Sequence, residues 1–174
     1  MSYRMWLFAF ACLRADIDLA RDDARNDNIG LFSNRAAHMK SYLISYFVAL
    51  VIFTGVDFVW LGRMGVAFYR PVMGDMVAEA FRPAPAVAFY LLYALGLVIF
   101  AISPALAAGK WETAALYGAL LGLFSYGTYD LTNQAILKNW STALSLVDMG
   151  WGALVSAFAA TCTYYLVSTF VRSV

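Results

Sequence analysis

The stretch SYLISYFVALVIFTGVDFVWL, residues 41–61, is apolar almost throughout and carries a single charged side chain, Asp57. An α-helix needs about 20 mostly apolar residues to cross the hydrocarbon core of a bilayer. Residues 41–61 therefore predict a transmembrane helix with a carboxylate close to one end.

Three further stretches are apolar and at least as long: residues 85–106, 113–137 and 142–170. Hydrophobic residues make up 63% of the chain and charged residues 13%, against about 25% charged residues in ordinary soluble domains. Short connections force neighbouring helices to run antiparallel. The sequence predicts an all-α protein, an integral membrane four-helix antiparallel bundle over residues 39–174.

The charge of the chain excludes one broad class of function. Its formal net charge is +1, and Lys and Arg form no basic stripe along the sequence. Nucleic-acid binding depends on such a stripe to neutralise phosphates. We therefore expect no nucleic-acid partner and take the lipid bilayer as the main surrounding.

Residues 1–38 differ from the rest because they hold closely mixed charges, as in RADIDLARDDARNDN. Two interpretations stay open: an N-terminal arm that is disordered or lies at the membrane interface, or sequence upstream of the native start. Met39 and Lys40 followed by an apolar run are typical of the beginning of a bacterial membrane protein. We expect translation to begin at Met39.

The connections predict the topology but not its orientation. Residues 62–84 form the longer predicted loop, and residues 107–112 and 138–141 form tight turns. Both termini should therefore lie on the same side of the membrane. Three Lys or Arg residues flank the spans on one side and four on the other, so the positive-inside rule does not decide which side is cytoplasmic.

Three carboxylates mark one end of the predicted bundle. Asp57, Asp130 and Asp148 lie at similar distances from their loops, and antiparallel alternation puts all three in one leaflet. Burial of Asp in a membrane costs free energy, so such residues usually face the interior of a bundle. We expect them to converge on one pocket that opens toward residues 62–84, with Asn133 inside it and Trp60 and Trp151 as walls.

An ordinary alternative is that each carboxylate reaches the headgroups and that the aromatic residues form an interfacial belt. The predicted ligand-binding set comprises Asp57, Trp60, Tyr126, Thr128, Tyr129, Asp130, Thr132, Asn133, Asp148 and Trp151.

The groups in this set that could bind a ligand or an ion are mainly oxygen atoms of carboxylates, amides and hydroxyls. The only histidine is His38, ahead of the predicted bundle. This excludes a His-ligated haem, a His-containing di-iron site and a Ser-His-Asp triad from the bundle. Carboxylates and amides could hold a hard cation, but their spacing matches no known metal motif. We therefore assign no metal, cofactor or catalytic residue.

Small residues predict close helix packing. Gly118 and Gly122 have the G-x-x-x-G spacing, and Gly150 and Gly152 lie on the next span. We interpret them as contacts within the bundle, with dimerisation as the alternative.

Four segments also resemble a known family: YLISYFVALVIFTGVDFVWLG, FYLLYALGLVIFAISPAL, YGTYDLTNQAILKNW and SLVDMGWG. They are similar to small bacterial four-helix membrane proteins grouped as domain of unknown function family 2177. The resemblance covers residues 39–166, which favours Met39 as the start, and it implies a multi-pass protein of the bacterial inner membrane. It carries no activity with it. The positions that match its motifs are Asp57, Trp60, Tyr126, Gly127, Thr128, Tyr129, Asp130, Thr132, Asn133, Asp148, Trp151 and Gly152.

Three functions stay open on these residues. The first is a site that binds or modifies an amphipathic, lipid-like substrate. The second is a proton- or cation-coupled carrier that uses the carboxylates as a relay. The third is an accessory subunit, in a homo-oligomer or beside another membrane protein, whose acids pair with basic residues of a partner.

Overall fold

The computed structural model describes residues 39–74 and 80–172 of the chain. Within these ranges the regular structure is entirely helical, with no strand. The predictions made for residues 1–38 lie outside them. The predicted fold class is confirmed: the protein is all-α and consists of four long helices, some of them interrupted by π-helical turns.

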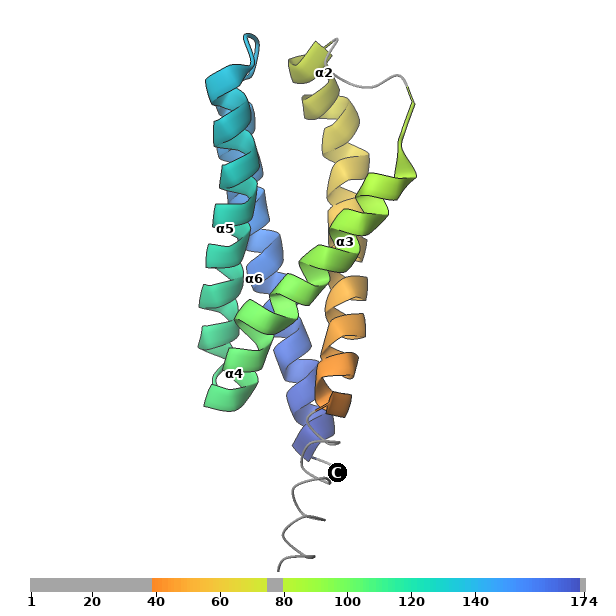
Figure 1. The fold of residues 1–174 in the computed structure, drawn as a ribbon, viewed down its shortest axis with the longest axis vertical. Helices are drawn as coiled ribbons and strands as arrows, with labels where there is room; N and C mark the ends of the chain where they lie inside the picture. The colour runs from red at the N-terminus through yellow and green to blue at the C-terminus, as the bar shows by residue number, and fades with distance from the viewer. Residues whose placement is uncertain (1–38, 75–79, 173–174) are drawn as a thin grey trace, which may run out of the picture. The chain divides into compact units, whose positions relative to one another are not determined.

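The helices alternate in direction along the chain (Figure 1). The bounds of the elements are, in order, the first spanning helix (Met39–Met73), which ends in η1 (Gly65–Tyr69) and α2 (Arg70–Met73); α3 (Pro83–Leu97), η3 (Val98–Ile102) and α4 (Ser103–Ala108), which together form the second spanning helix; α5 (Trp111–Ile136); and α6 (Thr142–Arg172). The end of α2 and the turn from α5 to α6 lie at the same end of the bundle. This is the antiparallel arrangement that the connections predicted.

Three of the four helices are long and apolar enough to cross a membrane: Met39–Met73, Pro83–Ala108 and Thr142–Thr169. The helix α5 is long enough, with 26 residues, but is less apolar. Its C-terminal part carries Asp130, Asn133 and Gln134, which lower its hydropathy. That α5 crosses the membrane stays a prediction.

The first spanning helix is longer than predicted. We expected it to end near residue 61 and residues 62–84 to form a loop, but the helix continues to Met73. Glycines at 62 and 65 and a proline at 71 indicated a loop, yet a single glycine costs a helix only about 1 kcal/mol. The helix ends at Gly74, whose φ of 52° is one that other residues rarely adopt.

Each of the two π-helical turns ends two residues before a proline. In the first case Pro71 follows η1, and in the second Pro104 follows η3; both prolines lie in the first turn of the next α-helical piece. Proline lacks an N–H and its ring clashes with the carbonyl oxygen four residues earlier. A wider turn relieves that clash, so each helix continues through its proline.

The turn into α5 is as tight as predicted. Gly109 ends α4 with a φ of 66°, and Lys110 N–H donates to the carbonyl oxygen of Ala105. This is the hydrogen bonding of a glycine-terminated helix. The next helix begins at once with Trp111.

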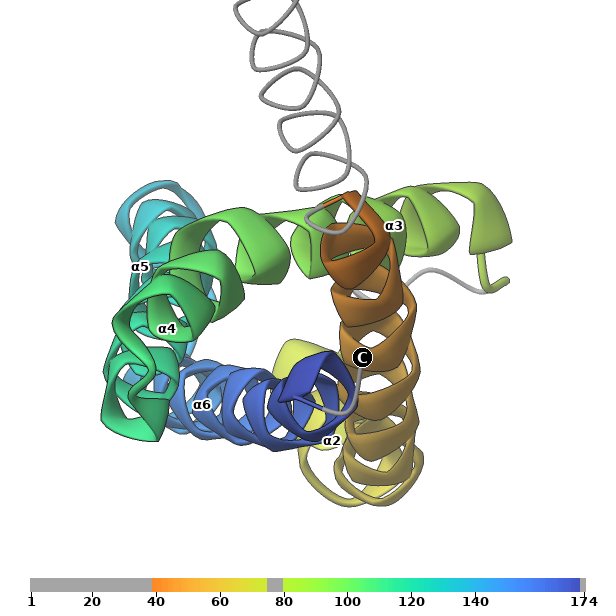
Figure 2. The same cartoon turned by 90° about the horizontal axis from the view of Figure 1, so that it is seen from below.

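All four helices contribute to the buried core. Phe53 comes from the first spanning helix, Leu97 and Ile102 from the second, Ala114 from α5 and Val155 from α6. Figure 2 shows the four helices arranged around a common centre. Many large apolar side chains instead face outward on every helix, including Phe47, Leu92, Phe124 and Phe158, as expected where lipid is the solvent.

The helices α5 and α6 approach each other closely at the predicted small residues. A Cβ atom on Gly122 would lie 2.0 Å from the carbonyl oxygen of Gly152, and one on Gly118 would lie 2.7 Å from that of Ser156. The G-x-x-x-G spacing therefore serves packing within the chain.

Candidate functional site

Asp57 lies at a junction of three helices. Its side chain is 4% exposed. One carboxylate oxygen accepts a hydrogen bond from the indole N–H of Trp151 on α6 at 2.8 Å, and the other accepts one from the hydroxyl of Tyr90 on α3 at 2.7 Å. The carboxylate of the first spanning helix thus binds both neighbouring helices.

A second hydrogen-bonded chain ends on Asp148 of α6. The hydroxyl of Tyr69 donates to a carboxylate oxygen of Asp148, and the indole N–H of Trp60 donates to the Tyr69 oxygen at 3.1 Å. The ring of Trp60 also stacks on that of Trp151. The stack joins this chain to the hydrogen bonds of Asp57.

Both carboxylates line a single cavity of about 550 Å³, which we call the acidic cavity. Its volume is in the usual range of small-molecule sites. Its lining residues are Asp57, Leu61, Tyr69, Ala86, Phe89, Tyr90, Ser125, Tyr126, Tyr129, Asp148 and Trp151. Among the described residues, no Lys or Arg pairs with Asp57 or Asp148.

Asp130 does not line this cavity. It is fully buried on α5, and neither of its carboxylate oxygens has a hydrogen-bond partner in the described part of the chain. Asp148 lies within electrostatic range of both Asp130 and Asp57. Of the three acids, only Asp57 and Asp148 line one space, so the expectation that all three converge on one pocket is not met for Asp130.

The other predicted residues also fall into two groups, those that line the acidic cavity and those that do not. Tyr126 and Tyr129 line the acidic cavity, whereas Asn133 does not. Thr128 and Thr132 are exposed, and their hydroxyls donate to the carbonyl oxygens of Phe124 and Thr128 one turn earlier. Such bonds within a helix satisfy the hydroxyl locally. These two threonines have no part in the cavity.

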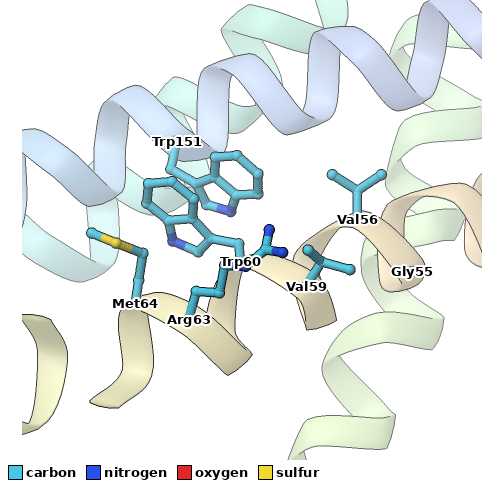
Figure 3. Close-up of a pocket in the computed structure, with 7 residues that line it drawn as sticks. All are labelled: Gly55, Val56, Val59, Trp60, Arg63, Met64 and Trp151. Atoms are coloured by element: carbon cyan, nitrogen blue, oxygen red, sulfur yellow. The ribbon is translucent and has the colours of Figure 1, made fainter. Parts of the chain in front are cut away.

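Trp60 belongs to a different space from the one predicted. It lies with Trp151 beside a second opening of about 510 Å³, lined also by Gly55, Val56, Val59, Arg63 and Met64 (Figure 3). We call this opening the Arg63 groove. Trp151 lines both spaces, so its ring borders the Arg63 groove and the acidic cavity.

Two residues that lie at the carboxylates, Tyr69 and Tyr90, were not predicted from the sequence. Tyr69 was assigned to the predicted loop, where no side-chain direction could be inferred. Tyr90 lies three residues before Tyr93 in an otherwise apolar span, and a buried Tyr hydroxyl usually finds a partner. That pair of tyrosines was a usable signal.

The acidic cavity offers a ligand carboxylates, hydroxyl groups and the faces of aromatic rings. Within the described residues, no group of three or more His, Cys, Asp or Glu side chains is arranged to hold a metal ion. The helix packing also serves the cavity: a Cβ atom on Gly152 would lie 2.3 Å from the ring of Tyr126. Gly152 thus makes room for one of the cavity walls.

A comparison with protein families matches residues 42–165 to a family described as predicted membrane protein, DUF2177. The chain belongs to this family. The matched range contains both carboxylates and every other residue that lines the acidic cavity. The family description agrees with the three described helices that are long and apolar enough to cross a membrane. No curated protein and no solved structure gives a significant match.

Proposed function

We propose that this DUF2177 protein binds a lipid-like, amphipathic molecule in the acidic cavity. The observation that carries the proposal is that two carboxylates from different helices, Asp57 and Asp148, line one cavity whose other walls are largely aromatic. The polar end of the ligand would meet the carboxylates. Its apolar part would lie along Phe89 and Leu61, in a bundle whose outer surface is suited to lipid.

The cost of the carboxylates supports a ligand role over a purely structural one. Burying an ionised group in a low-dielectric interior is expensive unless the group is paired. Asp57 has two neutral donors but no basic partner among the described residues. A bound polar group would supply the missing interaction. We place the protein, on its resemblance to bacterial proteins, in the cytoplasmic membrane.

The test is to extract the protein together with its surrounding lipid in polymer-bounded discs and to measure bound molecules by native mass spectrometry. The variant Ala86→Phe fills the cavity, because Ala86 lines it. Ala88→Phe is the matched control, since Ala88 is exposed and does not line the cavity. We expect a molecule enriched over bulk lipid with wild type and Ala88→Phe, and lost with Ala86→Phe.

Retention of the same molecule by Ala86→Phe would move the binding site elsewhere. A wild-type protein that carries only bulk lipid in bulk proportions would count against ligand binding altogether.

A further inference from the structure

We propose that the polar end of the ligand is an organic ammonium cation, held between the two carboxylates and the aromatic walls of the acidic cavity. This inference rests on the proposed function and specifies its ligand class. Three features of the cavity carry it: its charge, the use of its hydrogen-bond donors, and its aromatic surface.

The charge of the cavity is unbalanced. Asp57 and Asp148 both line it, and no Lys or Arg among the described residues pairs with either. Arg63 lines the Arg63 groove and not the acidic cavity. A cationic ligand would supply the missing positive charge, whereas an anionic head group would add to the repulsion.

The donors beside the carboxylates are already used. Tyr90 and Trp151 donate to Asp57, Tyr69 donates to Asp148, and Trp60 donates to Tyr69. The hydroxyl and indole hydrogen atoms beside Asp57 and Asp148 are thus committed to the protein's own side chains, and the remaining hydroxyls of the lining belong to Ser125, Tyr126 and Tyr129. What this part of the cavity still offers is oxygen lone pairs and ring faces, which suit a cation.

The aromatic surface fits an organic cation better than a metal ion. Six of the lining residues are aromatic: Tyr69, Phe89, Tyr90, Tyr126, Tyr129 and Trp151. Rings and carboxylates together are the usual surroundings of bound quaternary ammonium groups. A Ca²⁺ ion takes six to eight oxygen ligands, and the described residues provide no group of three acidic or other metal-binding side chains.

The experiment compares three probes with the same six-carbon tail: hexyltrimethylammonium, hexanol and hexyl sulfate. Their dissociation constants for the full chain in dodecyl maltoside micelles are measured by isothermal titration calorimetry, with protein-free micelles subtracted. We expect hexyltrimethylammonium to bind at least about tenfold more tightly than hexanol, from cation–π and charge interactions. Hexyl sulfate should bind most weakly.

Two charge variants locate the cation. Asp148→Asn should reduce the affinity for hexyltrimethylammonium about tenfold or more and leave that for hexanol almost unchanged. Glu112→Gln removes one carboxylate at the exposed start of α5, outside the cavity, and should change neither. The ranking of the probes on wild type stands even if a variant fails to fold.

The outcomes separate this inference from the proposed function. Equal affinities for hexyltrimethylammonium and hexanol, both lowered by Ala86→Phe, would overturn the ammonium inference and support an amphipathic ligand. Tighter binding of hexyl sulfate would overturn it as well. If no probe binds wild type, both the inference and the proposed function are wrong.

Discussion

The indole rings of Trp60 and Trp151 stack with their centroids 4.0 Å apart and their planes 6° from parallel. The two N–H groups point to different acceptors, the Tyr69 hydroxyl and the Asp57 carboxylate. Trp151 also lines both the Arg63 groove and the acidic cavity. A ligand that shifts Trp151 in one space must alter the other.

The first prediction concerns the hydrogen bond between Trp151 and Asp57. Trp151→Phe keeps an aromatic ring but removes the donor, so it should lower the free energy of unfolding by about 1.5–3 kcal/mol, as for bonds to charged groups. Trp140→Phe is the control, since Trp140 donates to the neutral Ser145 hydroxyl and should cost only about 0.5–1.5 kcal/mol. Reversible unfolding in mixed micelles measures both. Equal losses would contradict a charged bond at Asp57.

The second prediction compares two isosteric changes, Asp130→Asn and Asp57→Asn. Neither oxygen of Asp130 has a hydrogen-bond partner among residues 39–74 and 80–172, and a neutral amide costs less to bury than a carboxylate. Asp130→Asn should therefore stabilise the bundle, by about 1–3 kcal/mol. Asp57→Asn puts an NH₂ group against the donors of Tyr90 or Trp151, so it should destabilise the bundle by a similar amount. Thermal unfolding of both variants and of wild type shows whether each change raises or lowers the stability of the bundle.

A loss of stability in Asp130→Asn would mean that its carboxylate has a stabilising partner, such as a bound water or another subunit.

The third prediction tests the contact between α5 and α6. Gly122→Ala would put a Cβ atom 2.0 Å from a backbone oxygen, and overpacking of this kind costs about 1–3 kcal/mol. In contrast, a Cβ atom on Gly150 meets nothing within 4 Å, so Gly150→Ala should be neutral or slightly stabilising. Unfolding curves of the two variants in the same detergent give the comparison. Equal tolerance at both glycines would exclude the close approach.

The fourth prediction is that α5 crosses the membrane. In a variant whose two cysteines are replaced by alanine, Lys110→Cys and Lys138→Cys place single thiols just outside the two ends of α5. A membrane-impermeant maleimide should label one of them in intact cells and the other only after lysis. Labelling of both from the same side would leave three spans, the number that hydropathy alone supports.

The helices could be predicted from the sequence because the length of an apolar run reports the thickness of the bilayer directly. Residues 142–170 were predicted as a span, and α6 covers Thr142–Arg172. The end of the first helix was predicted wrongly, since Gly65 and Pro71 are tolerated there by a change of helix type that composition does not reveal.

The candidate site could be predicted only in part, for a geometric reason. Counting residues gives the depth of a side chain along a helix. It does not give the direction around the axis when most faces of the helix are apolar. Asp57 and Asp148 turned out to face the cavity, while Asp130 did not.

The π-helical turn η1 also sets the phase of the first spanning helix. Trp60 and Tyr69 are nine residues apart, and at about 100° per residue a continuous α-helix would put them about 180° apart, on opposite faces. The wider turn rotates Tyr69 back toward Trp60, which makes their hydrogen bond and the contact of Tyr69 with Asp148 geometrically accessible. The identity of the side chain that meets Asp148 therefore depends on the number of residues between Trp60 and Pro71. Within the family, a gain or loss of one residue in that interval would change the chemistry of the cavity while every one of its other lining residues stayed the same.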